Sequence, residues 1–134
     1  MDAAAKRLSL AFAAGALGAL AHGFALWFAG HIHLTAAIGV AIAPGLNTIW
    51  FYPHIVWGGL WGFLFALPVL ERSWVVRGLV LSLAPTLVQL FVIFPERTTA
   101  GTMGLGLGHL TPLVVLVANG IWGLAAAGWY RLLR

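Results

Sequence analysis

The side chains best suited to chemistry in this chain of 134 residues are its five histidines, which outnumber its three acidic residues. Imidazole is the commonest metal-binding side chain and suits zinc, copper and haem iron. The candidate metal ligands are His31, His33, His54 and His109. Their spacing does not favour a metal site, because no two histidines are four residues apart and no carboxylate is placed to orient them. We therefore expect no cofactor, with haem, copper or zinc as the alternative.

A haem group held between two helices needs two inward-facing histidines at matching depth in the membrane. His22 with His54 or with His109 is the combination to consider, and the expected depths of these residues match poorly. The outer histidines are instead predicted to lie at the membrane interface and to form hydrogen bonds with loop backbone.

Other catalytic signatures are absent from the sequence. Without cysteine there is no disulfide, thiolate metal site or thiol nucleophile. No Ser-His-Asp set is present, and Gly104-x-Gly106-x-Gly108 follows a loop rather than a strand, unlike a phosphate-binding loop. Glu71 and Glu96 are expected on opposite faces of a membrane, where they cannot act together. No catalytic residue is predicted.

Polar residues inside apolar segments predict a pocket. His22, Gln89 and Asn119 each need a polar partner if hydrocarbon surrounds them, so we expect them to face one another or a wet pocket open to the outer face. The further pocket candidates are Trp57, Trp61 and Trp122. This interpretation predicts a small transport or permeation unit, or an accessory subunit. The alternatives are a hydrogen-bonded knot that fixes helix register, and a metal- or haem-binding redox component.

Membrane-spanning helices must position these residues. The chain is 62% hydrophobic and 7% charged, against roughly 25% charged in soluble domains, and residues 8–70 contain no Asp, Glu, Lys or Arg. The sequence predicts an all-α four-helix bundle, one transmembrane domain over residues 1–134, with helices at about 8–28, 53–70, 77–94 and 107–130. Pro53 is expected in the first turn of its helix and Pro85 is expected to kink the next one.

Residues 29–52 are expected to form a short apolar outer segment, either re-entrant or interfacial. A short helix over residues 35–43 is predicted to end at Pro44. The alternative is a fifth span over residues 31–49.

The basic residues favour four spans over five. With four spans, six of the seven basic residues share the side of both termini, whereas Arg97 lies on the other side. The six residues are Lys6, Arg7, Arg72, Arg77, Arg131 and Arg134. This bias predicts that the N and C termini are cytoplasmic.

Small residues are expected to pack the helices closely. Helix one presents Gly15 and Gly23 on one face, and helix two presents Gly58 and Gly62. Gly104-x-x-x-Gly108 is predicted to do the same at the start of helix four. The glycine faces are expected to pack within the bundle, with a homo-oligomer or a larger membrane complex as the alternative. The lipid bilayer is the expected partner, and the net charge of +4 is attributed to membrane orientation rather than to nucleic acid.

The stretches Pro53-His54-Ile55, Arg77-Gly78-Leu79, Gln89-Leu90-Phe91-Val92 and Gly108-His109-Leu110 resemble the YagU-like family of bacterial inner-membrane proteins. The resemblance covers somewhat more than the second half of the chain and does not include the segment with His31 and His33. It implies a multi-pass protein of the bacterial cytoplasmic membrane. The family is uncharacterised, so the resemblance implies no activity.

Overall fold

The computed structural model describes residues 2–134, which form helices and no strand. The α-helices are α1 (Ala3–His31), α2 (Leu34–Ala37), α3 (Thr48–Gly62), α4 (Trp74–Val88), α5 (Phe94–Arg97) and α6 (Thr111–Leu133). Two 3₁₀-helices, η1 (Phe63–Ala66) and η3 (Thr102–Leu107), and a π-helix, η2 (Gln89–Ile93), complete the chain. Three helical runs are long and apolar enough to cross a membrane: Ala3–His31, Trp74–Arg97 and Thr111–Leu133. The chain is therefore an all-α protein of multi-pass membrane character.

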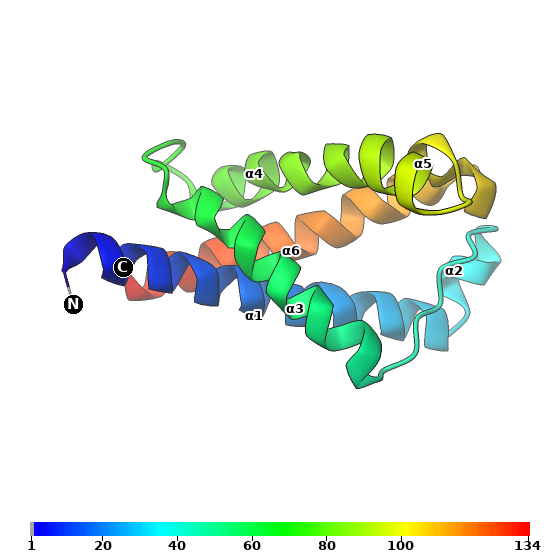
Figure 1. Ribbon diagram of the computed structural model, residues 1–134, viewed down its shortest axis with the longest axis horizontal. Helices are drawn as coiled ribbons and strands as arrows, with labels where there is room; N and C mark the ends of the chain where they lie inside the picture. The colour runs from blue at the N-terminus through cyan, green and yellow to red at the C-terminus, as the bar shows by residue number, and fades with distance from the viewer. Residues whose placement is uncertain (1) are drawn as a thin grey trace.

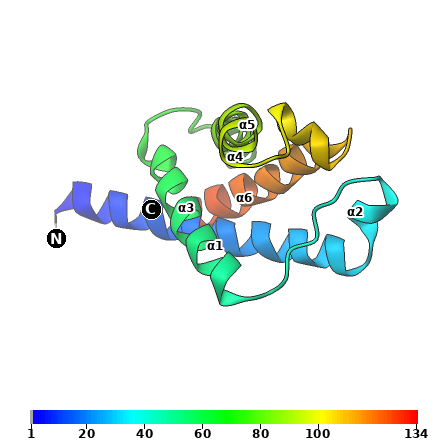
Figure 2. The ribbon, with the colours of Figure 1, turned by 45° about the vertical axis from the view of Figure 1, so that its right-hand side comes forward.

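The long helices alternate in direction along the chain. α1 and α4 run one way, α3 and α6 return, and the two termini lie at the same end of the molecule (Figure 1). α1 packs against α3 and α6, and α6 packs against α4. Turned by 45°, α4 is seen nearly end-on above α6, with α1 below (Figure 2). Within residues 2–134, α3 and α4 are thus the two ends of this packing series and have little contact with each other.

Side-chain caps fix where three helices begin. Asp2 Oδ1 accepts from the backbone N–H of Ala5 at 2.7 Å, and Asn47 Oδ1 accepts from that of Trp50 at 3.0 Å. A serine hydroxyl, that of Ser73, caps α4. Each cap satisfies one of the N–H groups that a helix start leaves without a partner.

Several predicted boundaries were wrong. Helix one extends at both ends beyond residues 8–28, and helix four begins at Thr111 rather than at residue 107. α3 begins at Thr48 because Asn47 caps it, so Pro53 lies inside the helix and not in its first turn. Between the end of α1 at His31 and the start of α3 at Thr48, the only helix is the four-residue α2, which excludes both a fifth span over 31–49 and a helix over 35–43.

The irregular part of the third apolar run lies beyond Pro85, not at it. The α-helical pattern continues to Val88 and then widens into η2, where Phe94 N–H bonds to Gln89 O. Pro95 follows directly and has no N–H to donate to the preceding turn. The π-helix therefore lies between two α-helical stretches of one run, α4 and α5.

Glycines bring α1 and α3 into backbone contact. A Cβ added at Gly15 would lie 2.2 Å from Gly58 O and 2.6 Å from Gly62 Cα. A Cβ added at Gly23 would likewise be too close to α3, at 2.9 Å from the ring of Phe51. These faces are used within the chain, as expected. An oligomer or larger complex formed through Gly15, Gly23, Gly58 and Gly62 is therefore not available in this fold.

The prediction for Gly104-x-x-x-Gly108 was wrong. Gly104 has φ +67° and Gly108 has φ +146°, so the two residues lie in turns and not on a helix face. A side chain at Gly108 would collide with Gly39 O, which brings the segment after α2 against η3. These glycines permit turns rather than helix packing.

A buried arginine secures the end of the molecule that carries the termini. Arg77 is 4% exposed, and its Nη2 donates to the carbonyls of Phe65 and Leu67 at 2.6 Å each. Its guanidinium also lies over the rings of Phe65 and Tyr130. Arg77 therefore holds the end of η1 against α4 and α6 without a carboxylate partner.

Candidate functional site

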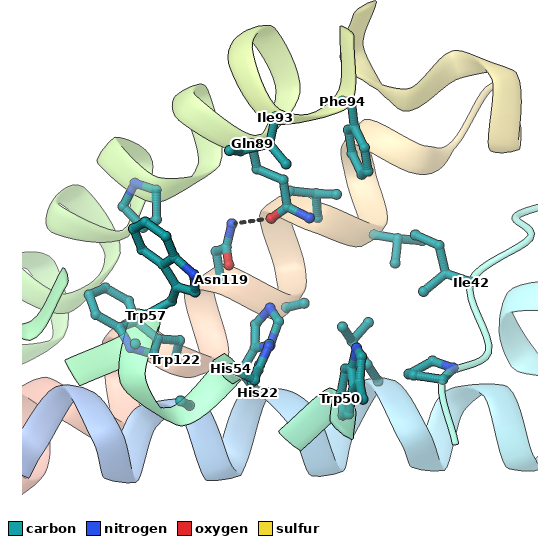
Figure 3. A pocket seen from close by; sticks show the side chains of 18 of the residues that line it. His22, Ile42, Trp50, His54, Trp57, Gln89, Ile93, Phe94, Asn119 and Trp122 are labelled. Carbon is teal, nitrogen blue, oxygen red and sulfur yellow. Dashed lines mark hydrogen bonds between the residues drawn. The ribbon is translucent and has the colours of Figure 1, made fainter. Parts of the chain in front are cut away.

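A cavity of about 610 Å³ lies between the helices in the half of the molecule that contains α2, α5 and η3. Its walls come from α1, α3, the α4–η2–α5 run and α6, and segment 41–44 also lines it. The six residues predicted to form a pocket all line this cavity: His22, Trp57, Trp61, Gln89, Asn119 and Trp122. Figure 3 shows several of them around a common space.

Two histidines meet at the centre of the cavity. His22 Nδ1 and His54 Nε2 are 2.7 Å apart, and the rings are tilted by 31°. His22 is 7% exposed and His54 is half-buried. The predicted mismatch in depth was wrong because α3 begins at Thr48, which places His54 about 9 Å down that helix, at the level of His22.

The contact between the two rings is a hydrogen bond and leaves no room for a metal ion. Zn–N bonds are about 2.0–2.1 Å long, so two ligating nitrogens at one tetrahedral ion are about 3.3 Å apart or more. The observed 2.7 Å is shorter. A haem or metal held between His22 and His54 would require the rings to separate.

A second polar group, from α4, η2 and α6, lies beside the histidine pair, with Asn119 within side-chain hydrogen-bonding reach of His22. Asn119 Nδ2 donates to Thr86 Oγ1 at 3.0 Å and to Gln89 Oε1 at 3.5 Å (Figure 3). Thr86 in turn donates to the carbonyl of Ser82 at 2.8 Å. Gln89 is also the first residue of η2, so the π-helix begins at the cavity wall. π-helices are often found at functional sites.

Tryptophans supply much of the apolar wall. Trp122 is 3% exposed, and its Nε1 donates to Gly15 O at 3.0 Å, which ties α6 to α1 beneath the cavity. Trp57, by contrast, is 63% exposed. Trp50 was not predicted as a site residue. It stacks on His54 with the ring centroids 4.8 Å apart. The i, i+4 spacing of Trp50 and His54 would have indicated this pair once both were placed on one helix.

Segment 40–46 crosses the end of the cavity that was predicted to be open. Its Ala41 N–H bonds to Leu107 O at 2.9 Å, and its Ala43 lies against Gly30 at the end of α1. Thr35 Oγ1 donates to the carbonyl of Ile42 at 2.8 Å, which holds the segment in place. The segment therefore bridges α1 and η3 over one end of the cavity.

The most exposed lining side chains mark where the cavity opens. Trp57 of α3 is 63% exposed and Ile93 of η2 is 40% exposed, while Asn119 and Val115 of α6 are buried. α3 and α4 have little contact with each other, so no helix packing closes the space between them. The wall of the cavity is therefore open laterally, between α3 and η2, and the exposed Ala41 and Ala43 of segment 40–46 also line the cavity.

The structure does not bring the four predicted metal ligands together. His31 is exposed and stacks on Trp27 with the centroids 5.0 Å apart. His33 and His109 are also exposed, while His54 lies inside the cavity. Within residues 2–134, no three His, Cys, Asp or Glu side chains are grouped to hold a metal ion.

The lining of the cavity is mostly apolar, with a few polar side chains. The cavity combines two imidazoles and two side-chain amides with aromatic and aliphatic walls, and no Asp, Glu, Lys or Arg lines it. Pockets that bind small molecules have this composition, mostly apolar with a few convergent polar groups.

Comparison of the chain with protein-family models, with curated proteins and with solved structures gives no match.

Proposed function

We propose that this chain is a four-pass membrane protein whose intramembrane cavity binds a small ligand, as a transport or permeation unit or as an accessory subunit. All of residues 1–134 form one transmembrane domain in this proposal. The carrying observation is the cavity of about 610 Å³, which has the His22–His54 pair in its lining and Asn119 with Gln89 beside that pair. Buried polar groups that surround a space, rather than only one another, support a binding role.

The direction of the helices supports α3 as the fourth span. α1 and α4 run in the same direction (Figure 1), so the chain must cross back between them. The 15 residues of α3 and the four of η1 make the return. Their combined length is about 30 Å, which equals the thickness of the hydrocarbon core. Asp, Glu, Lys and Arg are absent from this stretch.

The charge distribution supports cytoplasmic termini. Six of the seven basic residues lie at the end of the molecule that carries both termini, and Arg97 lies at the other end. The positive-inside rule places the richer end in the cytoplasm. The bacterial cytoplasmic membrane as the location rests only on the sequence resemblance to YagU-like proteins.

Cysteine accessibility tests the cavity, because the chain has no native cysteine. Ala118 is 4% exposed and lines the cavity, whereas Ala126, two turns along α6, is 0% exposed and lies in the core. In membranes, N-ethylmaleimide should alkylate the Ala118→Cys variant at least tenfold faster than Ala126→Cys, because a polar cavity of this size admits water and reagent. Mass spectrometry measures both rates.

Equal, slow alkylation of the two variants would contradict the proposal, since the polar residues would then be a closed hydrogen-bonded knot. Both substitutions replace alanine with cysteine on the same helix, so they differ mainly in their surroundings. Their thermal unfolding should be compared first, to establish that Ala126→Cys is folded.

A further inference from the structure

The cavity has no fixed charge to pair with an ion. Asp, Glu, Lys and Arg are all absent from its lining, and His22 and His54 are its only titratable side chains. The hydrogen bond between these two rings requires at least one of them to be neutral, because an imidazolium has no acceptor nitrogen, and burial without a carboxylate nearby disfavours charge on the other ring. A charged ligand would lose its hydration without gaining a counter-charge, at a cost of several kcal/mol per ion. The lining therefore favours an uncharged ligand.

The histidine pair presents both kinds of hydrogen-bonding atom whichever ring donates. If His22 Nδ1–H donates, His22 Nε2 is left as an acceptor and His54 Nδ1–H as a donor; the reverse arrangement exchanges these roles. Within residues 2–134 the outer nitrogen of His54 forms no other hydrogen bond, whereas His22 also lies within side-chain hydrogen-bonding reach of Asn119. The Gln89 amide nitrogen adds a further donor, because Gln89 uses only its Oε1 in the bond with Asn119. Such a set suits a carbonyl or hydroxyl oxygen.

The opening of the cavity faces the hydrocarbon rather than water. Trp57 lies about 14 Å along α3 from Thr48, which is near mid-membrane if α3 spans the bilayer. The surface beside the opening carries exposed apolar side chains, among them Leu60 on α3 and Phe91 on η2. Segment 40–46 covers the outer end of the cavity. A ligand dissolved in the bilayer can therefore enter sideways, with its apolar tail left among lipid chains.

We infer that the ligand is an uncharged amphiphile taken from the bilayer, with an oxygen-bearing head held by the histidine pair and the Asn119–Gln89 group and an apolar tail in the opening between α3 and η2. This inference rests on the proposed function and specifies the ligand class of the same cavity. Two sources share this chemistry: a quinone, whose head is a ring with carbonyl oxygens, and a long-chain alcohol, whose head is a hydroxyl.

Protection of the Ala118→Cys variant from N-ethylmaleimide tests the inference. Four probes with the same ten-carbon tail are compared at equal membrane-bound concentration: decylubiquinone, decanol, decyl sulfate and decyltrimethylammonium. At least one neutral probe should slow alkylation at a concentration tenfold or more below that required for either charged probe. Protection by decylubiquinone indicates the carbonyl head, and protection by decanol indicates the hydroxyl head.

Equal protection by charged and neutral probes overturns the inference and leaves the proposed binding function in place. Alkylation of Ala118→Cys that no probe slows also overturns it. By contrast, an Ala118→Cys variant that never reacts overturns the proposed function itself. The three results are therefore distinguishable with one variant.

A second pair of variants tests the lateral opening. Val88 lines the cavity, while its neighbour Leu87 does not and is 55% exposed. In the Ala118→Cys background, Val88→Trp should weaken protection by the effective neutral probe at least fivefold, and Leu87→Trp should leave it unchanged. Equal effects of the two tryptophans would contradict entry between α3 and α4.

Discussion

The direct hydrogen bond between His22 and His54 joins α1 to α3 at the centre of the cavity. His54→Phe retains a ring that can stack on Trp50 but removes both nitrogens, so His22 loses its partner. Loss of such a hydrogen bond costs about 1 kcal/mol of unfolding free energy. We expect that loss in detergent-solubilised protein, together with at least tenfold weaker protection of Ala118→Cys by the neutral probe.

The same substitution at His31 is the matched control. His31 also stacks on a tryptophan, Trp27, but is exposed and lies outside the cavity. His31→Phe should change neither stability nor protection. If His31→Phe and His54→Phe reduce protection equally, the histidine pair has no special role in binding.

Sequence reasoning could place the polar cavity residues but not their partners. His22 follows Gly15 and Gly18 at helical spacing, so an inward direction could be inferred from one helix alone. The His22–His54 bond depends on where α3 begins, and residues 29–52 were assigned to an outer segment. Because of that assignment, Trp50 was not predicted as a cavity residue. It lines the cavity because Asn47 caps α3 and the helix begins at Thr48.

At the scale of the elements, the contact of α1 with α3 depends on the absence of side chains. Gly15→Ala would place a methyl group 2.2 Å from a backbone oxygen of α3, so the helices must separate. Overpacking of this kind costs about 1–3 kcal/mol, and we expect the unfolding free energy to fall by that amount. Denaturation in mixed micelles of increasing dodecyl sulfate fraction measures the change.

Gly120→Ala provides the comparison on α6. A Cβ at Gly120 would meet only Leu79 Cδ2, at an ordinary 3.7 Å. Because alanine favours helix by up to about 1 kcal/mol over glycine, this variant should be as stable as the parent protein or more stable. Similar destabilisation by the two alanines would mean that close α1–α3 packing is not what stabilises the bundle.

Helix existence followed from hydropathy, whereas helix ends and irregular turns did not. Long uninterrupted apolar runs are typical of membrane-spanning helices, so the all-α class could be predicted. The ends depend on single caps such as Asn47, and the path after α2 depends on the turn glycines Gly39 and Gly108. The π-helix that begins at Gln89 is likewise not indicated by the hydropathy of α4.

At the scale of the whole molecule, the number of spans determines which side each terminus occupies. Three spans put the termini on opposite faces of the membrane, and four put them on the same face. The parallel course of α1 and α4 favours four, because α3 must return the chain between them (Figure 1). Lateral access from the bilayer also depends on α3 being a span, since Trp57 faces lipid only if α3 lies within the bilayer.

Single-cysteine variants of the cysteine-free chain test the topology in intact cells with a membrane-impermeant maleimide. Leu46→Cys and Thr99→Cys should be labelled from outside, because both positions are exposed at the end with α2 and η3. Lys6→Cys and Arg131→Cys should be labelled only after the cells are broken. The decisive comparison is between Leu46→Cys and Arg72→Cys, which flank α3 and η1. Labelling of both from the same side would show that α3 does not cross, and the lateral route into the cavity would then be lost with the fourth span.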